Sequence, residues 1–141
     1  MNPQVVVPPR DDSDLVYLPV ADAMAIAVQG ALVSLESSTA VLLNADTEDA
    51  TFAGFAMTVH AADEALPNEV TVALKGQVIY DCTSAAYDTG AGVKYVSLNA
   101  VVADGGANTL AWAASLEASA VTRLRTLVDV LALGKLFATD A

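Results

Sequence analysis

The sequence predicts a mainly β protein: a small β-barrel or sandwich that follows an extended, proline-containing N-terminal arm. Hydrophobic residues make up 55% of the chain, and the prominent alanine and valine suit sheets and close packing. Short runs of alternating apolar and polar residues are separated by glycine, aspartate and asparagine at regular spacing. The 141 residues fit one domain with a real core. We therefore expect an arm over residues 1–20 and a β-barrel core domain over residues 21–141.

The first 14 residues have the composition of an extended arm. Pro3, Pro8 and Pro9 exclude a regular helix there and favour extended backbone. The run QVVV between these prolines is either a strand that adds to the edge of a neighbouring molecule or a frayed terminus. The residues favour the two interpretations equally.

Short strands are expected in the first half of the core. Residues 30–45 contain two apolar runs joined by the polar letters ESST, which predicts two short strands. Residues 47–59 begin with a polar turn and continue as a strand that Gly54 interrupts. The segment 21–28 is compatible with a helical turn, and residues 60–69 are expected to form a loop.

One of the clearest patterns spans residues 68–82, NEVTVALKGQVIYDC. Apolar and polar residues alternate up to Gly76 and alternate again after it. A glycine inside such a pattern usually marks a bulge or a sharp bend, which allows a small sheet to curl into a barrel. If the alternation continues through the glycine, Cys82 is a small buried hydrophobic residue on the core face. That face would consist of Val70, Val72, Leu74, Val78, Tyr80 and Cys82.

The last third of the chain predicts further strands. Glycine-rich turns at residues 90–92 and 104–108 are expected to be hairpin connections between them. Residues 121–128 alternate as a strand, although residues 115–136 also fit a helix with leucines near one face. The density of threonine and valine favours the strand.

Two arginines, Arg123 and Arg125, lie two positions apart in this last strand and therefore face the same side. They are candidates for pairing with acidic residues across a subunit boundary. The alternative is a solvated pair that contributes little to stability.

Catalysis through a histidine or cysteine would have to use the only histidine, His60, or the only cysteine, Cys82. A Cys–His pair requires that the fold bring them together, and His60 ends a predicted strand, where a surface position is expected. A tetrahedral zinc site would need mostly carboxylate ligands. The glycine turns match no phosphate-binding loop. The sequence therefore predicts no catalytic residue, no metal site, no cofactor and no enzymatic activity.

Acidic residues dominate the charge of the chain, with 17 acidic and six basic side chains and a formal net charge of −11. Nucleic acids and anionic membranes are bound by clustered basic residues, so neither is expected as a partner. Asp11, Asp12 and Asp14 leave open a site for a hard cation. They lack the glycine and the further ligands of a calcium loop, which favours a solvated acidic turn. Residues 46–49 form a second acidic turn.

Six motifs follow one another along the chain: GALVSL, FAGFAMTV, EVTVALKGQVIYD, TGAGVKYVSLNAVV, GGANTLAWAAS and VTRLRTLVDV. This succession resembles the small capsid decoration (cement) proteins of tailed bacteriophages. Those proteins have a β-barrel core with a V-x-V-x-x-x-G strand, a glycine-turn strand and a final arginine-containing strand. The likeness covers about residues 26–130. The long arm and the sequence LAWAAS in the penultimate strand depart from the pattern.

The resemblance implies a structural role for a subunit made in the host cytoplasm. Such a subunit adds to the outer surface of an expanded phage head and stabilises the shell through many small contacts repeated by symmetry. Its partners would be the major capsid protein and copies of itself. Such proteins bind as trimers at local three-fold positions or as monomers across capsomer seams, and a homotrimer is expected here. A cation- or carbohydrate-binding β module and a small Cys/His enzyme are the alternatives. The expected capsid or subunit contacts are Val5, Val6, Val7, Pro8, Pro9, Arg10, Arg123 and Arg125.

Overall fold

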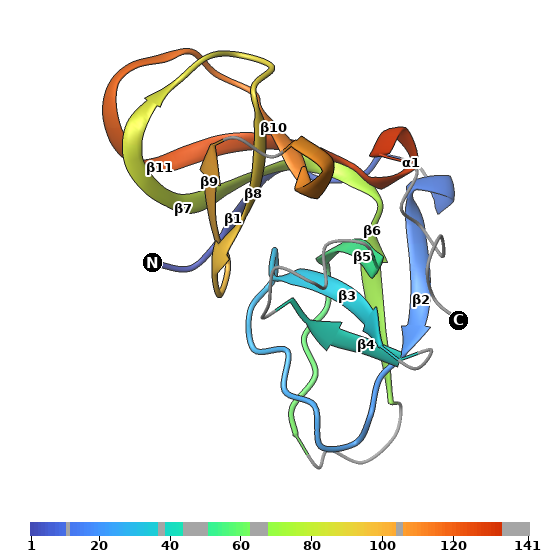
Figure 1. Ribbon diagram of the computed structural model, residues 1–141. Coiled ribbons are helices and arrows are strands. Elements are labelled where there is room, and N and C mark those ends of the chain that lie inside the picture. Colours follow the sequence, from blue (N-terminus) through green and yellow to red (C-terminus); the bar gives the residue numbers. More distant parts are fainter. Residues whose placement is uncertain (11, 37–38, 44–50, 63–67, 104–105, 134–141) are drawn as a thin grey trace.

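The structure is a computed structural model. It describes residues 1–10, 12–36, 39–43, 51–62, 68–103 and 106–133. Within these residues the chain is mainly β, as the sequence predicts, and its strands form two sheets (Figure 1). The helical segments are short: the 3-10 turns η1 (Asp12–Asp14) and η3 (Gly106–Asn108), and the single-turn helix α1 (Val130–Leu133).

The larger sheet has six strands, and five of them close into a barrel. They are β1 (Gln4–Val7), β7 (Lys75–Tyr87), β8 (Gly92–Ser97), β9 (Ala100–Ala103), β10 (Ala111–Ala113) and β11 (Glu117–Asp129). The order is β1-β7-β11-β10-β8-β9, and a parallel pairing of β7 with β9 closes the barrel. β11 pairs along one edge of β7, so β1 and β9 share the other edge. The helical alternative for residues 115–136 is wrong, because β11 occupies most of that region.

The smaller sheet has five strands from the first half of the chain. They are β2 (Leu15–Pro19), β3 (Leu32–Glu36), β4 (Thr39–Leu42), β5 (Phe52–Ala56) and β6 (Glu69–Ala73). The order is β2-β6-β5-β3-β4. A parallel bridge between Val20 and Ala40 brings its two edges together. The two strands expected in residues 30–45 are therefore confirmed as β3 and β4.

β6 leads directly into β7, so one stretch of chain joins the two sheets (Figure 1). The chain bends at Leu74, and Gly76 follows the bend. A Cβ added to Gly76 would lie 2.6 Å from the carbonyl oxygen of Val7 and 2.7 Å from Cζ of Phe55. Glycine permits this close approach. The expected burial is confirmed for Val70, Val72, Leu74, Val78, Tyr80 and Cys82. The single face is not confirmed, because Val70 and Val72 pack in one hydrophobic core and the residues from Val78 onward pack in the other.

The smaller sheet contributes side chains to two hydrophobic cores. Leu32 and Phe55 pack with barrel residues such as Tyr80 in the first core. Val33 packs in the second core, because neighbouring residues of a strand face opposite sides. Ala53 also packs there, although it lies two residues from Phe55, because the pairing of β3 with β5 shifts by one residue beside it. The sheet therefore has apolar packing on both faces.

The extended arm is not confirmed as a separate unit. Its two segments form β1 and β2, which pair with β7 and β6 of the same chain. Val5 lies opposite Val78 and packs against the barrel core. The run QVVV is thus an edge strand on its own molecule, and the frayed-terminus interpretation is wrong.

The prediction that both glycine-rich turns are hairpin connections is wrong. Gly90 lies between β7 and β8, and η3 lies between β9 and β10, and neither pair of strands is adjacent in the sheet. The hairpin in this region joins β8 to β9 through Leu98 and Asn99. Asn99 has a φ of 54°, which asparagine tolerates. Its Oδ1 accepts a hydrogen bond of 3.0 Å from the backbone N–H of Leu32, which ties the hairpin to the smaller sheet.

Candidate functional site

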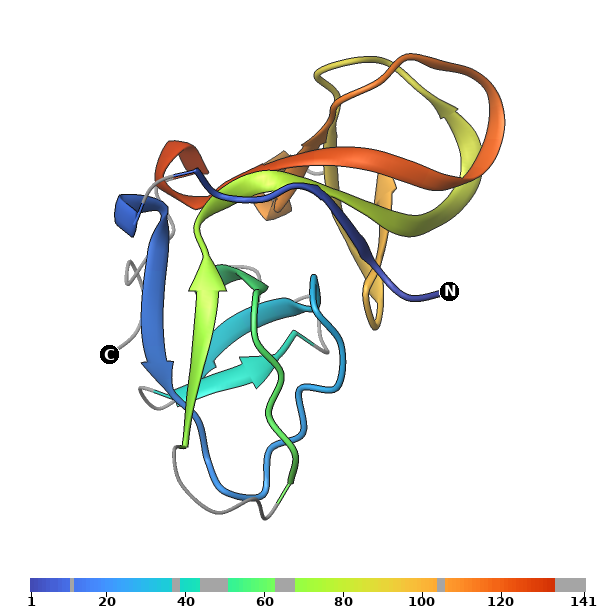
Figure 2. The same ribbon diagram turned by 180° about the vertical axis from the view of Figure 1, so that it is seen from behind.

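The outer surface of β1, β7 and β11 carries basic side chains next to apolar ones. The three strands lie side by side (Figure 2). On β11, Leu124 and Thr126 are buried, so the odd-numbered residues around them face outward. Cross-strand pairing places Leu127 opposite Gln77, Arg125 opposite Ile79 and Arg123 opposite Asp81. We call this surface the arginine face and define it as Val7, Gln77, Ile79, Asp81, Arg123, Arg125 and Leu127.

An open pocket of about 260 Å³ lies at one end of the arginine face, where β1 ends and β7 begins. Arg10 and Lys75 bring positive charge to its lining, and Asp14 brings one carboxylate. Proline has no backbone N–H, so the prolines after Val7 end the pairing of β1 with β7. The rest of the lining is Val7, Pro8, Pro9, Gly76, Gln77 and Leu127. The pocket thus has an apolar lining together with two cations.

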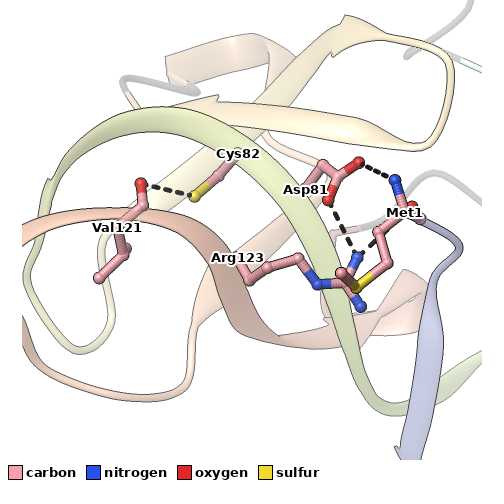
Figure 3. Close-up of polar contacts among 5 residues, drawn as sticks. All are labelled: Met1, Asp81, Cys82, Val121 and Arg123. Carbon is pink, nitrogen blue, oxygen red and sulfur yellow. Dashed lines mark hydrogen bonds and ion pairs between the residues drawn. The ribbon is translucent and has the colours of Figure 1, made fainter.

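Arg123 is held by an acidic residue of its own chain. Its Nη1 donates a hydrogen bond of 3.0 Å to Oδ1 of Asp81, and the α-amino group of Met1 donates one of 3.0 Å to Oδ2 (Figure 3). Hydrogen bonds from the α-amino group first and from Arg123 second hold the pKa of Asp81 below its usual range. The carboxylate that pairs with Arg123 here therefore lies within the chain, opposite it on β7.

Arg125 is more exposed and more weakly held. Its Nη1 lies 3.5 Å from Oε1 of Gln77, and it forms no ion pair with any residue that the structure describes. Lys75 is also exposed, and its Nζ is 3.9 Å from Oδ2 of Asp129. Much of the positive charge on this side of the molecule is accordingly available to an outside carboxylate.

The eight predicted contact residues fall into three groups in the structure. Val5 and Val6 are half-buried within β1, and Val5 packs against the barrel core. Val7 and the three residues after it line the pocket. Arg123 and Arg125 face the same side of β11, as predicted. The sequence did not identify their neighbours Lys75, Gln77 and Asp81. The sequence pattern does not determine the register between β7 and β11, which are far apart in the chain.

Cys82 is buried at the far part of β7, as predicted. Its Sγ lies 3.5 Å from the carbonyl oxygen of Val121 (Figure 3), and burial raises the pKa of its thiol. Burial, followed by a hydrogen bond with Cys82, raises the pKa of Tyr87 to about 12. The Tyr87 hydroxyl donates a hydrogen bond of 2.6 Å to the carbonyl oxygen of Thr83. A thiol with a raised pKa is a poor nucleophile, so this cluster suits packing better than catalysis.

The prediction that His60 lies on the surface is wrong. The side chain is 1% exposed, and the backbone of His60 forms an antiparallel bridge with Ile26. Its Nδ1 donates a hydrogen bond of 2.6 Å to the carbonyl oxygen of Met24, and its Nε2 lies 3.1 Å from Oδ1 of Asn68. The ring thus joins two loops of the smaller sheet, whereas Cys82 belongs to the barrel core. The fold does not bring the two candidate catalytic residues together.

The acidic turns fall mostly outside the described residues. Asp11 and residues 46–49 lie outside them, and the side chain of Asp12 does too, whereas Asp14 lines the pocket. Within the described part of the chain, no group of three or more His, Cys, Asp or Glu side chains is placed to hold a metal ion. In the same part, no helix has the length and apolar character needed to cross a membrane.

Comparisons with models of protein families, with curated proteins and with solved structures find no match to this chain.

Proposed function

We propose that this chain is a structural decoration protein that binds the outside of an expanded phage head and stabilises its shell without catalysing a reaction. The observation that carries the proposal is that each of the six motifs contains all or part of one or two strands of the structure. The six motifs supply β3, β5, β6 with β7, β8 with β9, β10 and β11 in that order. The resemblance implies a β-barrel core, and strands β7 to β11 form a barrel.

The uses of the rarer side chains support a structural role. Cys82 packs in the barrel core, and the His60 ring joins two loops through hydrogen bonds. The Tyr80 hydroxyl donates a buried hydrogen bond of 2.6 Å to the carbonyl oxygen of Gly30. Each of these groups holds the fold together, which supports a protein that acts through its outer surface.

In this proposal the partners are the major capsid protein and further copies of the chain, arranged as a homotrimer on the capsid outer surface. Symmetry repeats each small contact, and simultaneous contacts raise the total affinity without a deep binding site. The high negative charge keeps densely displayed copies soluble and repels nucleic acid.

Sedimentation with capsid shells tests the proposal. The purified chain is mixed with expanded and with unexpanded shells of the major capsid protein whose gene lies nearest to its own. We expect saturable binding to the expanded shells only. An acidic protein of similar size serves as the control for trapping in the pellet. Equal recovery with both kinds of shell, or no recovery with either, would contradict the proposal.

The genes beside that of this chain give a second test. We expect them to encode a major capsid protein and a prohead protease. A neighbourhood of metabolic genes alone would contradict the proposal.

A further inference from the structure

We infer that the arginine face and its pocket form a docking surface for the acidic remainder of a second copy of this chain. The inference rests on the self-association in the proposed function and names the surface that mediates it. Its basis is the uneven placement of the few basic residues.

Positive charge is concentrated on one side of a strongly acidic molecule. Four of the six basic residues lie on the arginine face or line its pocket: Arg10, Lys75, Arg123 and Arg125. Among the described side chains, Asp14, Asp81 and Asp129 are the acidic ones that accompany them. Most of the 17 acidic residues belong to the rest of the chain, which has two basic residues. The arginine face and its pocket are therefore richer in basic residues than the rest of the sequence.

The arginine face has the chemistry of a protein interface. Ile79 and Leu127 are half-buried apolar residues between the basic side chains, and the neighbouring pocket adds Pro8 and Pro9. Protein interfaces are enriched in arginine and in apolar groups at their centre. The guanidinium group also binds carboxylates with two parallel hydrogen bonds, which gives geometric specificity.

Two of the four cations are held within the chain and two are more available. Arg123 pairs with Asp81 at 3.0 Å, and Lys75 lies 3.9 Å from Asp129. Arg125 and Arg10 are exposed, and neither forms an ion pair with the described residues. Arg125 and Arg10 are therefore the side chains that reach the carboxylates of the second copy.

A second copy is the occupant because it carries the complementary charge. Long-range repulsion between two chains of net charge −11 opposes random contact, whereas an arrangement that sets the arginine face against an acidic surface is favoured. Such a contact joins two different surfaces, so it is heterologous and generates a ring when the rotation closes.

Charge-reversal variants measured by sedimentation equilibrium test the inference. We expect R125E and R10E each to weaken self-association of the full chain about tenfold, a loss of ~1.4 kcal/mol. K94E is the matched control, because Lys94 lies on β8 away from this surface and its reversal changes the net charge equally. A wild-type chain that stays monomeric, or a K94E variant that weakens association as much as R125E, would overturn the inference. Thermal unfolding confirms that each variant is folded.

Zero-length crosslinking identifies the partner of the pocket directly. Unlabelled and ¹⁵N-labelled copies are mixed, and a carbodiimide joins lysine amines to carboxylates within contact distance. Lys75 is expected to crosslink to acidic residues of the other isotope, beyond the link to its own Asp129. If every crosslink of Lys75 joins residues of one copy, the inference is wrong.

The two proposals fail in different ways. Self-association is measured without shells, so a monomeric wild type that still binds expanded shells refutes the docking surface and leaves the decoration role intact. An oligomer that R125E dissociates, but that binds no shell, refutes the decoration role and leaves the docking surface intact.

Discussion

Gly54 and Gly90 both adopt positive φ angles, of 132° and 88°, but their surroundings differ. A Cβ on Gly54 would overlap the carbonyl oxygen of Ala73, whereas a Cβ on Gly90 would meet nothing within 4 Å. Both substitutions by alanine force a backbone conformation that residues with a side chain rarely adopt. We expect G54A to lower the free energy of unfolding by ~1–3 kcal/mol more than G90A, because it also overpacks the core. Urea denaturation measures the difference. Equal losses of unfolding free energy in the two variants would contradict the close contact between a Cβ at position 54 and Ala73.

The pKa of Asp81 predicts a pH dependence at the same scale. This pKa is lower in the folded chain than in the unfolded chain, so the ionised carboxylate favours folding above about pH 4. The contribution is lost as the pH falls through the lowered value. We expect D81N to reduce the melting temperature at pH 7, and the difference from the wild type to shrink as the pH falls below 4. The effect corresponds to at most about 1 kcal/mol, because the pair is partly exposed to solvent.

The control for this measurement is D88N, which removes an exposed carboxylate that forms no ion pair with the described residues. Its melting temperature should follow that of the wild type at every pH. A constant gap between D81N and the wild type from pH 2 to pH 7 would exclude the ion pair as the cause.

At the scale of elements, β1 is a removable strand with a structural task. Deletion of residues 1–10 uncovers the edge of β7 at residues 77–79 and removes the packing of Val5. We expect the rest of the chain to stay folded, with a lower melting temperature, more aggregation and weaker attachment to shells. Deletion of residues 1–3 is the control, since it leaves β1 in place. Unchanged stability after the longer deletion would contradict the role of β1 in the fold, and unchanged shell binding would contradict its role in attachment.

The elements show what the sequence could predict. Alternation located the strands and the buried positions between Val70 and Cys82, because side-chain direction has a period of two. It could not show that these positions pack in two different cores. It does not show which strands are neighbours, which is why the pattern wrongly predicts hairpins at residues 90–92 and 104–108. His60 was misplaced for a related reason, since its burial depends on Ile26, Met24 and Asn68, which come from distant loops. The pocket needed β1, β7 and β11 in register, which local patterns do not encode.

At the scale of the whole molecule, the smaller sheet makes the two cores interdependent. Leu32 and Phe55 belong to the core shared with the barrel, and Val33 and Ala53 in the same strands belong to the other. Loss of packing on one face of β3 or β5 should therefore also weaken the packing on the other face. We expect the chain to unfold as one cooperative unit.

Calorimetry of F55A tests this interdependence. Phe55 is fully buried, and its replacement should lower the free energy of unfolding by ~3–5 kcal/mol while a single transition is kept. Y17A is the matched control, because Tyr17 is 61% exposed and its loss should change stability by no more than about 0.5 kcal/mol. Two separate transitions, with only one of them shifted in F55A, would show that the sheets unfold independently.

The pairing of β1 with β7 also determines when β1 can fold during synthesis of the chain. The valines of β1 have no strand to join until the middle of the chain has left the ribosome, because their partners are residues 77–79. Until then the apolar β1 segment is exposed and unpaired on the nascent chain. Prolines flank this segment on both sides, and acidic residues follow it: Pro3 before it, and Pro8, Pro9 and the aspartates after it. Residues of these kinds keep an unpaired strand from joining the same strand of a neighbouring nascent chain.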